Sequence, residues 1–356
     1  MDQSLSTFGW NEYFTDEWEK LAVKDAVPAR VIADFGTSLK LATPTIITAE
    51  LSGRMAHYSN REHVPKVGDW VAVTIADSGH AVIIDVVPRH SEIARKIAGN
   101  QTVKQVIAAN IDIAFVLISM NGDFSVERLK RFLYQLSINN IQPIIVLTKA
   151  DKTNDSAAYI SQLKTFELPI ITSSSLTGEG MKEIRGYITP AKTAILLGSS
   201  GVGKSTLTNN LLGRDAQQTQ EVRSSDSTGK HTTIHREIFI LPNGGLLIDT
   251  PGIRELQLWG TEEDLDENFD DVASLISECL YTTCQHGSEK GCAVQAAIHD
   301  GELTSAHFAS YNKMKRELAT LKTKSNERSK WLNKKSKKKV ERQVRDLIND
   351  EKQDIN

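Results

Sequence analysis

The sequence GSSGVGKST, at residues 198–206, decides the fold of this chain. It fits the pattern G-x-x-x-x-G-K-[ST], whose fixed positions are Gly198, Gly203, Lys204 and Ser205. The preceding TAILL (residues 193–197) is typical of a buried strand, and the following TLTNNLLG (206–213) predicts a helix ended by glycine. A strand, a glycine-rich loop and a helix in this order predict a phosphate-binding site.

Each part of this loop has a chemical reason to be there. Glycines let backbone N–H groups converge on phosphate oxygens, and the helix N-terminus adds positive potential. Lys204 would reach the β- and γ-phosphates, and Ser205 would bind Mg²⁺. The residues predicted to contact the nucleotide are Gly198, Ser199, Ser200, Gly201, Val202, Gly203, Lys204, Ser205 and Thr206. A chance glycine-rich turn is disfavoured because both the strand and the helix flank it.

Length and composition indicate a multidomain protein of the cytoplasm. A chain of 356 residues predicts two or three domains. No apolar run reaches the roughly 18 residues that a membrane span requires. The N-terminus lacks the basic and apolar regions of a secretory signal. All three cysteines lie within one short window, which in a cytosolic protein indicates a metal site rather than disulfides.

The net charge of -3 conceals a strong asymmetry. Residues 313–345 contain 14 Lys or Arg and three Asp or Glu, a net charge of +11, so the remainder carries -14. A basic tail on an acidic body suggests an anionic partner, although many such tails are only solvated arms.

Residues 29–95 read as a series of short strands. ARVIADF, TIITAEL, DWVAVTI and HAVIIDVV are β-rich segments separated by turn signals. Their spacing predicts a small barrel, best matched by an OB-fold, and such barrels often bind oligonucleotides. Basic residues gather around one loop: Arg54, His57, Arg61, His63 and Lys66. They would either meet phosphates or form a solvated basic loop.

From residue 103 strands alternate with helices. The segments 110–120, 141–148 and 168–172 read as strands, and 124–138 reads as an amphipathic helix. Alternation of this kind predicts a parallel sheet flanked by helices, with ligands beyond the carboxyl ends of its strands. The sequences TKAD, TSSS and GSSGVGKST all lie at such ends, so we expect them to face one crevice.

A second phosphate motif follows the phosphate loop. REIFILPNGGLLIDTPG predicts a hairpin that ends in DTPG. Asp249 of this motif would hold the Mg²⁺ shell through water, and the N–H of Gly252 would meet the γ-phosphate. The phosphate loop and DTPG together predict a nucleoside triphosphatase.

The TKAD sequence indicates which base is bound. The Asp151 carboxylate can accept hydrogen bonds from guanine N1–H and the exocyclic amine, a pair that adenine does not offer. The stem of Lys149 can cover the face of the base. A backbone N–H near Ser173 and Ser174 can reach guanine O6. Lys and Asp are common on surface loops, so TKAD gains its weight from ending a strand of the same sheet.

The order of these motifs resembles a circularly permuted GTPase. The chain runs TKAD, TSSS, GSSGVGKST, GKHTT and DTPG, whereas ordinary GTPases begin with the phosphate loop. With an N-terminal barrel and a C-terminal Cys/His cluster, the chain resembles the ribosome small-subunit-dependent GTPase A family over about residues 28–320. The fold expected is an OB-fold β-barrel, a circularly permuted α/β P-loop GTPase domain and a mostly α zinc-binding subdomain.

The patterns along the chain predict domain boundaries, and the resemblance implies a reaction and partners. The divisions are an extension (1–27), the barrel (28–98), the GTPase domain (99–262), the zinc subdomain (263–323) and a basic tail (324–356). Family members hydrolyse GTP to GDP and phosphate and act in late maturation of the small ribosomal subunit. The implied partners are that subunit and its rRNA, and we expect a monomer. The extension and the tail lie outside the resemblance.

Two departures from other GTPases bear on the mechanism. Thr148 stands where many GTPases have Asn, which weakens one support of the base loop. Ile253 stands where Ras-like enzymes have the Gln that orients water, so His231 becomes the candidate for this role. A surface histidine without a role is the competing interpretation. Thr232 or Thr233 should close on Mg²⁺ and the γ-phosphate.

The cysteines form part of a metal-ligand pattern. The spacing C-x4-C-x-H-x5-C comprises Cys279, Cys284, His286 and Cys292. Three thiolates and one imidazole make a closed tetrahedral zinc site, which is structural because no position remains for a substrate water. Three free thiols are the alternative. His299 and His307 read as helix residues rather than ligands.

Three functions compete for this sequence. The first is a GTPase that acts on the small ribosomal subunit and is stimulated by it. The second is a GTP-dependent RNA-binding module without ribosome specificity. The third, a metabolic P-loop kinase, is disfavoured by TKAD and by the paired threonines.

Overall fold

The computed structural model describes residues 3–36, 38–58, 63–75, 80–96, 104–213, 236–249 and 258–323. The chain divides into two compact units. The first comprises residues 1–95 and 104–257, and the second comprises residues 96–103 and 258–356. No helix among the described residues is both long and apolar enough to cross a membrane.

The first unit begins with a five-stranded barrel. Its strands are β1 (Val27–Asp34), β2 (Leu39–Ala42), β3 (Ile46–Leu51), β4 (Trp70–Ile75) and β5 (His80–Val86). They pair in the order β1-β2-β3-β5-β4, and β4 returns to β1, so the barrel closes. Only the β3–β5 pair is parallel. The OB-like barrel is therefore confirmed, although β2 was not among the expected strands.

Alternation along the strands explains the barrel core. In β5, Ala81 and Ile83 are buried while His80 and Val82 are exposed, as expected when successive side chains point to opposite faces. Ile83 packs with Val31, Leu41 and Val73 inside the barrel. Helix α3 (Gly53–Tyr58) follows β3 and contributes Met55 to the same core.

The barrel continues into the central sheet of the unit. This sheet contains β8 (Ile113–Ser119), β9 (Gln142–Thr148), β10 (Ile170–Thr172), β11 (Thr193–Leu197), β12 (Arg236–Ile240) and β13 (Leu246–Asp249). Its order is β10-β9-β8-β11-β13-β12, in which only β12 is antiparallel to its neighbour. Strand β12 also pairs with β1, where Ala33 lies opposite Glu237.

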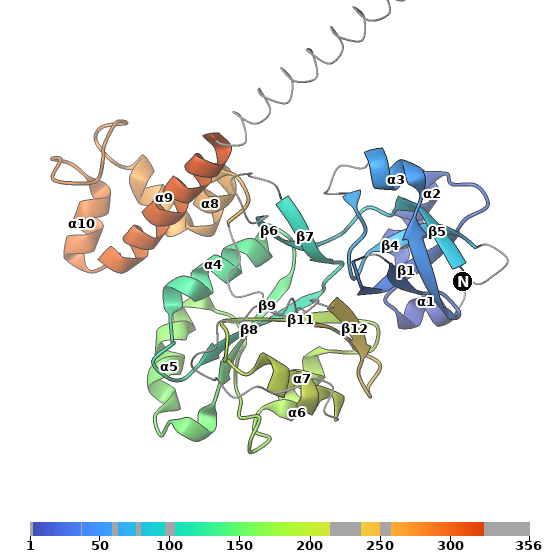
Figure 1. The fold of residues 1–356 in the computed structure, drawn as a ribbon. Helices are drawn as coiled ribbons and strands as arrows, with labels where there is room; N and C mark the ends of the chain where they lie inside the picture. The colour runs from blue at the N-terminus through green and yellow to red at the C-terminus, as the bar shows by residue number, and fades with distance from the viewer. Residues whose placement is uncertain are drawn as a thin grey trace, which may run out of the picture. The chain divides into compact units, whose positions relative to one another are not determined.

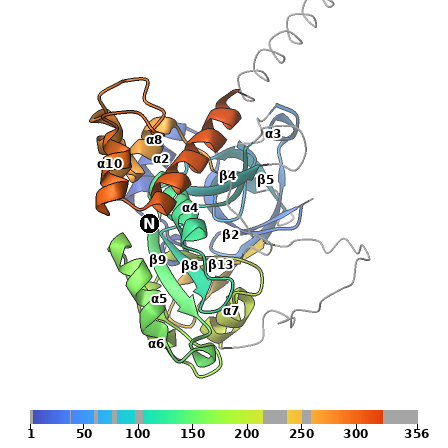
Figure 2. The same cartoon turned by 90° about the vertical axis from the view of Figure 1, so that its left-hand side faces the viewer.

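Helices cover both faces of this sheet (Figures 1 and 2). Helices α4 (Val126–Ser137) and α5 (Ser156–Leu163) pack on one face, and α6 (Met181–Tyr187) and α7 (Lys204–Leu212) pack on the other. All seven residues of β8 are buried, as expected for a strand covered on both sides. Short 3-10 turns, η2 (Ala150–Lys152) and η3 (Lys164–Phe166), precede and follow α5.

Two N-terminal helices dock on the barrel. Helix α2 (Glu12–Leu21) begins at Asn11, whose side chain accepts a hydrogen bond from Phe14 N, and it follows the short α1 (Gln3–Thr7). Phe14 is 2% exposed and packs with Trp70 of β4. The ring of Trp10 meets Trp70 edge-on at 4.8 Å between centroids. The aromatic residues of this extension therefore extend the hydrophobic core.

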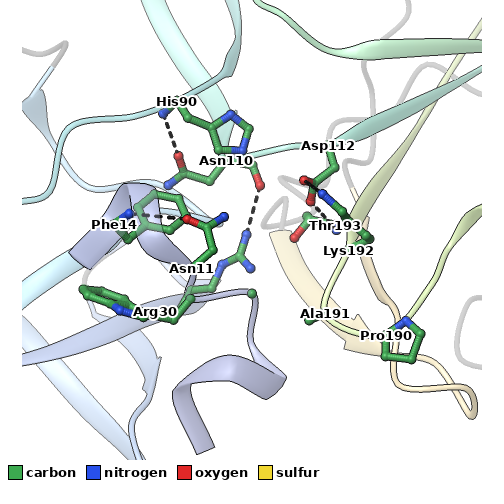
Figure 3. Close-up of a pocket in the computed structure, with 12 residues that line it drawn as sticks. Asn11, Phe14, Arg30, His90, Asn110, Asp112, Pro190, Ala191, Lys192 and Thr193 are labelled. Atoms are coloured by element: carbon green, nitrogen blue, oxygen red, sulfur yellow. Dashed lines mark hydrogen bonds and ion pairs between the residues drawn. The ribbon is translucent and has the colours of Figure 1, made fainter. Parts of the chain in front are cut away.

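Arg30 links three parts of the first unit. It is 1% exposed and donates hydrogen bonds to the carbonyls of Phe8, Gly68 (3.2 Å) and Asn110 (3.0 Å), the last drawn in Figure 3. Burial lowers the pKa of Arg30 to about 10, so the guanidinium remains charged at neutral pH. It thereby joins the N-terminal helices, the barrel and the segment that leads into β8.

A polar cavity of about 120 Å³ lies beside Arg30 (Figure 3). His90 and Asn110 line it together with Asp112 and Thr193. Asp112 accepts hydrogen bonds from Lys192 Nζ and Thr193 N, both at 2.8 Å. A cavity of this size and polarity suits a few ordered waters.

Between the barrel and β8 the chain forms a two-stranded ribbon of β6 (Glu92–Lys96) and β7 (Lys104–Ala109). The Glu92 carboxylate forms ion pairs with Arg89 (2.9 Å) and Lys104. These partners hold the pKa of Glu92 below its ordinary value, against the opposing effect of its burial.

The second unit is helical in its described part. It contains α8 (Glu262–Asn268), α9 (Asp270–Ser277), α10 (Ala293–Asp300) and a helix at residues 305–323. Thr261 and Asp264 form a capping box at the start of α8. The ring of Tyr311 in the last helix packs at a tilt against Phe269, with 5.7 Å between the ring centroids, and its hydroxyl donates to Asp266 at 2.7 Å. This confirms the expected mostly α C-terminal region.

Candidate nucleotide and metal sites

The phosphate loop joins the centre of the sheet to α7. Strand β11 ends at Leu197, as the sequence predicted, and α7 begins at Lys204, two residues before the predicted start of the helix. Gly198 has φ +149°, and a Cβ there would lie 2.7 Å from the carbonyl oxygen of Leu117. Gly203 has φ +111° at the N-cap of α7. Both positions therefore require glycine, for close packing in the first case and for backbone conformation in both.

Lys204 is already turned toward its own loop. Its ammonium donates to the carbonyls of Gly198 and Ser199, each at 2.7 Å. Ser205 lies in the first turn of α7, and Asp249 ends β13, which is parallel to β11. The structure thus brings these side chains to the same edge of the sheet, where parallel α/β folds bind ligands.

The base loop is tied to the phosphate loop by Thr148. Its hydroxyl donates to the carbonyl of Val202 at 2.8 Å, and Thr148 itself is 7% exposed. The support that we expected this Thr to weaken is therefore present. A hydroxyl can replace a longer amide here because β9 brings Thr148 within direct reach of the loop.

Asp151 has a partner that fixes its orientation. Ser174 Oγ donates to Asp151 Oδ1 at 2.6 Å, which brings the TKAD and TSSS sequences together across 23 residues. Lys149, between Thr148 and Asp151, adopts φ +64° at the start of η2. This left-handed conformation turns the chain sharply at the end of β9, between Thr148 and Asp151 of the TKAD sequence.

The backbone amides of the TSSS loop differ in their engagement. Ser173 N donates to Leu147 O at 2.8 Å, and Ser174 N donates to Glu179 O at 3.2 Å. The backbone N–H groups of Ser173 and Ser174, near which we expected the contact to guanine O6, are therefore already engaged within the protein. Within the described part of the chain, Ser175 N has no acceptor, while its carbonyl accepts from Asn210 at 2.8 Å. Sequence alone could not separate these three consecutive serines.

Several predicted residues lie outside the described residues. They are His231, Thr232, Thr233, Gly252, Ile253, Arg61 and the basic tail from residue 324. Of the basic barrel loop, Lys66 is paired with Asp34 at 3.2 Å, which favours a structural role for this side chain. Arg54 and His63 are exposed.

The second unit contains the expected cluster of metal-ligating side chains. One ligand atom from each of Cys279, Cys284, His286 and Cys292 lies within 4.8 Å of all the others. Cys279 Sγ lies 4.0 Å from Cys292 Sγ and 3.5 Å from His286 Nδ1. Thiolates about 2.3 Å from a zinc ion in a tetrahedron would be just under 4 Å apart, so the donor set fits this metal.

The surroundings of the cluster hold its ligands in place. Cys292 caps α10 by accepting a hydrogen bond from Gln295 N, and Gln295 Nε2 donates to the carbonyl of His286 at 2.6 Å. Phe308 packs edge-on against the His286 ring. A hydrogen bond from His286 N acts to lower the pKa of the Cys284 thiol, but burial and the neighbouring thiols of Cys292 and Cys279 outweigh it and raise this pKa to about 11. A bound cation would favour the thiolate form of this side chain.

One residue near the phosphate loop was not expected from the sequence. Asp123, in the turn after β8, accepts a hydrogen bond from Ser199 Oγ at 2.5 Å. Its position at the carboxyl end of a parallel strand was the signal that could have identified it.

These features define a circularly permuted P-loop GTPase. The base loops after β9 and β10 precede the phosphate loop in the chain, yet they meet it at one edge of the sheet. The sequence matches the model of the RsgA GTPase family over residues 86–259, and a family described as 50S ribosome-binding GTPase over residues 193–334.

Curated relatives extend this match to most of the chain. The small ribosomal subunit biogenesis GTPase RsgA of Opitutus terrae is 38% identical over 330 residues, which are 89% of this chain and 90% of the relative. A protein of Oceanobacillus iheyensis with the same name, numbered RsgA 1, is 41% identical over 80% of this chain and 84% of its own length. The chain belongs to the RsgA GTPase family.

Solved structures agree with this fold. YjeQ from Thermotoga maritima has a TM-score of 0.60 at 23% identity and covers 83% of this chain and 99% of its own. YloQ, described as a circularly permuted GTPase, has a TM-score of 0.57 at 25% identity and covers 83% and 96%.

Proposed function

We propose that this GTPase acts in the biogenesis of the small ribosomal subunit, binds rRNA and is stimulated by the subunit. The observation that carries the proposal is identity of 36% to 41% over most of the chain with relatives named for this process. The non-specific RNA-binding alternative has no comparable support. A cytoplasmic, monomeric protein remains our expectation.

The residues of the nucleotide site are assigned roles on their chemistry. Lys204 would neutralise the β- and γ-phosphates, Ser205 would bind Mg²⁺ directly, and Asp249 would hold the metal through water. Backbone N–H groups of the phosphate loop would bind the phosphate oxygens, and that of Gly252 the γ-phosphate.

Guanine would be selected by Asp151, which accepts from N1–H and the exocyclic amine. Its hydrogen bond from Ser174 supports this assignment because it aims the carboxylate. Ser175 N would donate to guanine O6, since the amides of Ser173 and Ser174 are engaged elsewhere. The aliphatic stem of Lys149 would cover one face of the base.

The hydrolytic step would depend on the switch residues. His231 is our candidate to orient the attacking water, because Ile253 offers no hydrogen bond. Thr232 or Thr233 would complete the Mg²⁺ and γ-phosphate contacts. Replacing His231 with Ala should then lower kcat far more than GTP affinity, and an unchanged kcat in the stimulated reaction would remove it from the mechanism.

The second unit would hold one structural zinc ion through Cys279, Cys284, His286 and Cys292. The closed Cys3His donor set supports zinc rather than a catalytic metal. The divisions at residues 27, 98, 262 and 323 likewise remain proposals for the limits of the domains.

The decisive experiment compares partners. GTP hydrolysis is measured with purified small subunits, large subunits and protein-free rRNA, with Lys204→Ala as the inactive control. We expect stimulation by small subunits alone. Stimulation by free RNA to the same extent would support the non-specific alternative, and stimulation by large subunits alone would favour the other matching family's description.

A further inference from the structure

Asp123 lies in a structured turn between β8 and α4. Asn121 Oδ1 accepts hydrogen bonds from Ser119 Oγ at 2.8 Å and from Asp123 N at 3.0 Å. These bonds fold the turn back on the end of β8. The Asp123 carboxylate is thereby presented to the phosphate loop, whose Ser199 hydroxyl donates to Oδ2 at 2.5 Å.

The other carboxylate oxygen is held by the first turn of α4. Arg128 Nη1 lies 3.0 Å from Asp123 Oδ1, and Arg128 N donates to the N-cap Ser125 at 3.2 Å. The side chains of Asp123 and Arg128 are 43% and 36% exposed, so their ion pair contributes little by itself. Its effect is to direct the second oxygen toward Ser199.

Ser199 connects this carboxylate with the essential lysine of the loop. Its hydroxyl binds Asp123, and its carbonyl accepts from Lys204 Nζ at 2.7 Å. Fixing the side chain of Ser199 restricts rotation of the adjoining peptide, whose carbonyl is one of the two that hold the ammonium. A displacement at Asp123 is therefore transmitted to Lys204 through one residue.

We propose that Asp123 is a positioning residue for GTP hydrolysis, acting through Ser199 on the Lys204 ammonium. This rests on the proposed GTPase activity and adds to it a residue that need not touch the nucleotide. The hydrogen bond from Ser199 lowers the pKa of Asp123. Burial opposes this effect, and Arg128 and Lys149 lower the pKa further. Asp123 is thus ionised, and a carboxylate accepts a stronger hydrogen bond from a hydroxyl than a protonated carboxyl group does.

The effect should fall on turnover more than on binding. Many N–H groups of the loop share the binding of the phosphates. Stabilisation of the charge that develops on the phosphates in the transition state depends instead on a correctly placed lysine. We expect Asp123→Ala to lower kcat about tenfold and to weaken GTP binding about threefold or less, on the scale of one charge-assisted hydrogen bond. Asp123→Asn keeps an acceptor oxygen and should lose less.

The test is a double-mutant cycle with Asp123→Ala and Ser199→Ala. Steady-state kcat, affinity for a fluorescent GTP analogue and melting temperature are measured for the wild type, both single variants and the double variant. If Asp123 acts through Ser199, the double variant should be no slower than either single variant. The matched control is Glu127→Gln, which removes an exposed carboxylate from the first turn of α4, close to Asp123 in the chain. This variant should behave as the wild type.

Two results would overturn the proposal: single variants with wild-type kcat, or losses that multiply in the double variant. If Asp123→Ala does not fold, Ser199→Ala and Asp123→Asn carry the test, because both leave α4 and its cap unchanged. Absence of GTPase activity in the wild type would instead contradict the proposed function. The two failures are therefore distinguishable.

Discussion

At the scale of single residues, the carboxylate that we propose for base recognition is held by a hydroxyl. Ser174 Oγ lies 2.6 Å from Asp151 Oδ1, so Asp151 presents its remaining lone pairs in a fixed direction. The same serine caps its own loop by accepting from Leu176 N and Thr177 N, both at 3.3 Å. One side chain thus organises both base loops.

This arrangement predicts a change of substrate on mutation of Asp151. Asp151→Asn should weaken GTP binding by about 100-fold, because the amide cannot accept both guanine hydrogen bonds. The variant should gain affinity for xanthosine triphosphate, whose C2 oxygen accepts from the amide. Competition binding with GTP, ATP and xanthosine triphosphate measures both effects. Equal binding of ATP and GTP to the wild type would show that the base assignment is wrong.

Thr148 offers a test of the link between the base and phosphate loops. Thr148→Val preserves shape but removes the hydroxyl, leaving the buried carbonyl of Val202 without this donor. We expect a loss of about 1 to 2 kcal/mol in stability, together with weaker GTP binding. Thr148→Ser keeps the donor and serves as the control. A Val variant as stable as the Ser variant would mean that the hydrogen bond from Thr148 to Val202 does not contribute to the free energy of unfolding.

The residue scale also shows where sequence reasoning succeeds. The phosphate loop and the four-residue metal cluster could be located because their spacing is fixed by the ligand, and TKAD indicated Asp151 as the candidate for base binding. Nothing in SSS shows which of the three amides is engaged, so Ser175 could not be singled out. The place of Asp123 at a strand end made it a candidate, but nothing in NGD shows that its carboxylate meets Ser199. The role of Thr148 was underestimated because the sequence does not give the distance between β9 and the phosphate loop.

At the scale of elements, buried strands and helices could be predicted from the sequence, whereas a short strand could not. The apolar pattern and the flanking glycines predicted the bounds of β11. They also predicted the existence of α7 and its end at a glycine. Strand β2, of four residues, was missed, because its pairing with β1 and β3 rather than its own sequence makes it a strand.

The segment between α9 and α10, which carries all four metal-ligating residues, has little hydrophobic packing of its own. Around Cys284 and His286 the chain between α9 and α10 is largely exposed, so the ligand cluster is its main constraint. We predict that Cys284→Ser, or removal of metal by a chelator, unfolds this loop and lowers the melting temperature of the second unit. Metal analysis of the purified chain should give one zinc ion per molecule. A metal-free protein with unchanged melting would contradict the structural role.

Arg30 is the corresponding constraint in the first unit. Arg30→Met should destabilise this unit by about 3 kcal/mol, because it removes a buried donor from three carbonyls. Because the pKa of Arg30 is lowered to about 10, its charge is present in folded and unfolded states below pH 9. Its stabilising contribution should therefore be constant between pH 6 and 9, as urea unfolding of both proteins across that range would test.

At the scale of the whole molecule, nucleotide and RNA binding must be coupled for the proposed function. Strand β12 follows the segment that contains His231 and pairs directly with β1 of the barrel, at Ala33–Glu237 and Asp34–Arg236. A continuous sheet therefore joins the OB-like barrel to β12, the strand that follows in sequence the segment expected to respond to the γ-phosphate. Bound RNA and bound GTP would bias the same element, which is the physical requirement for allostery.

The measurement that tests this account most directly is the affinity for small ribosomal subunits in each nucleotide state. Co-sedimentation is performed with a non-hydrolysable GTP analogue and with GDP across a salt series, using the full chain and a chain ending before Lys330. We predict binding at least tenfold tighter with the analogue, weakening steeply with salt, and a smaller salt slope without the basic tail. Equal affinity in both nucleotide states, or equal binding to large subunits, would contradict the account.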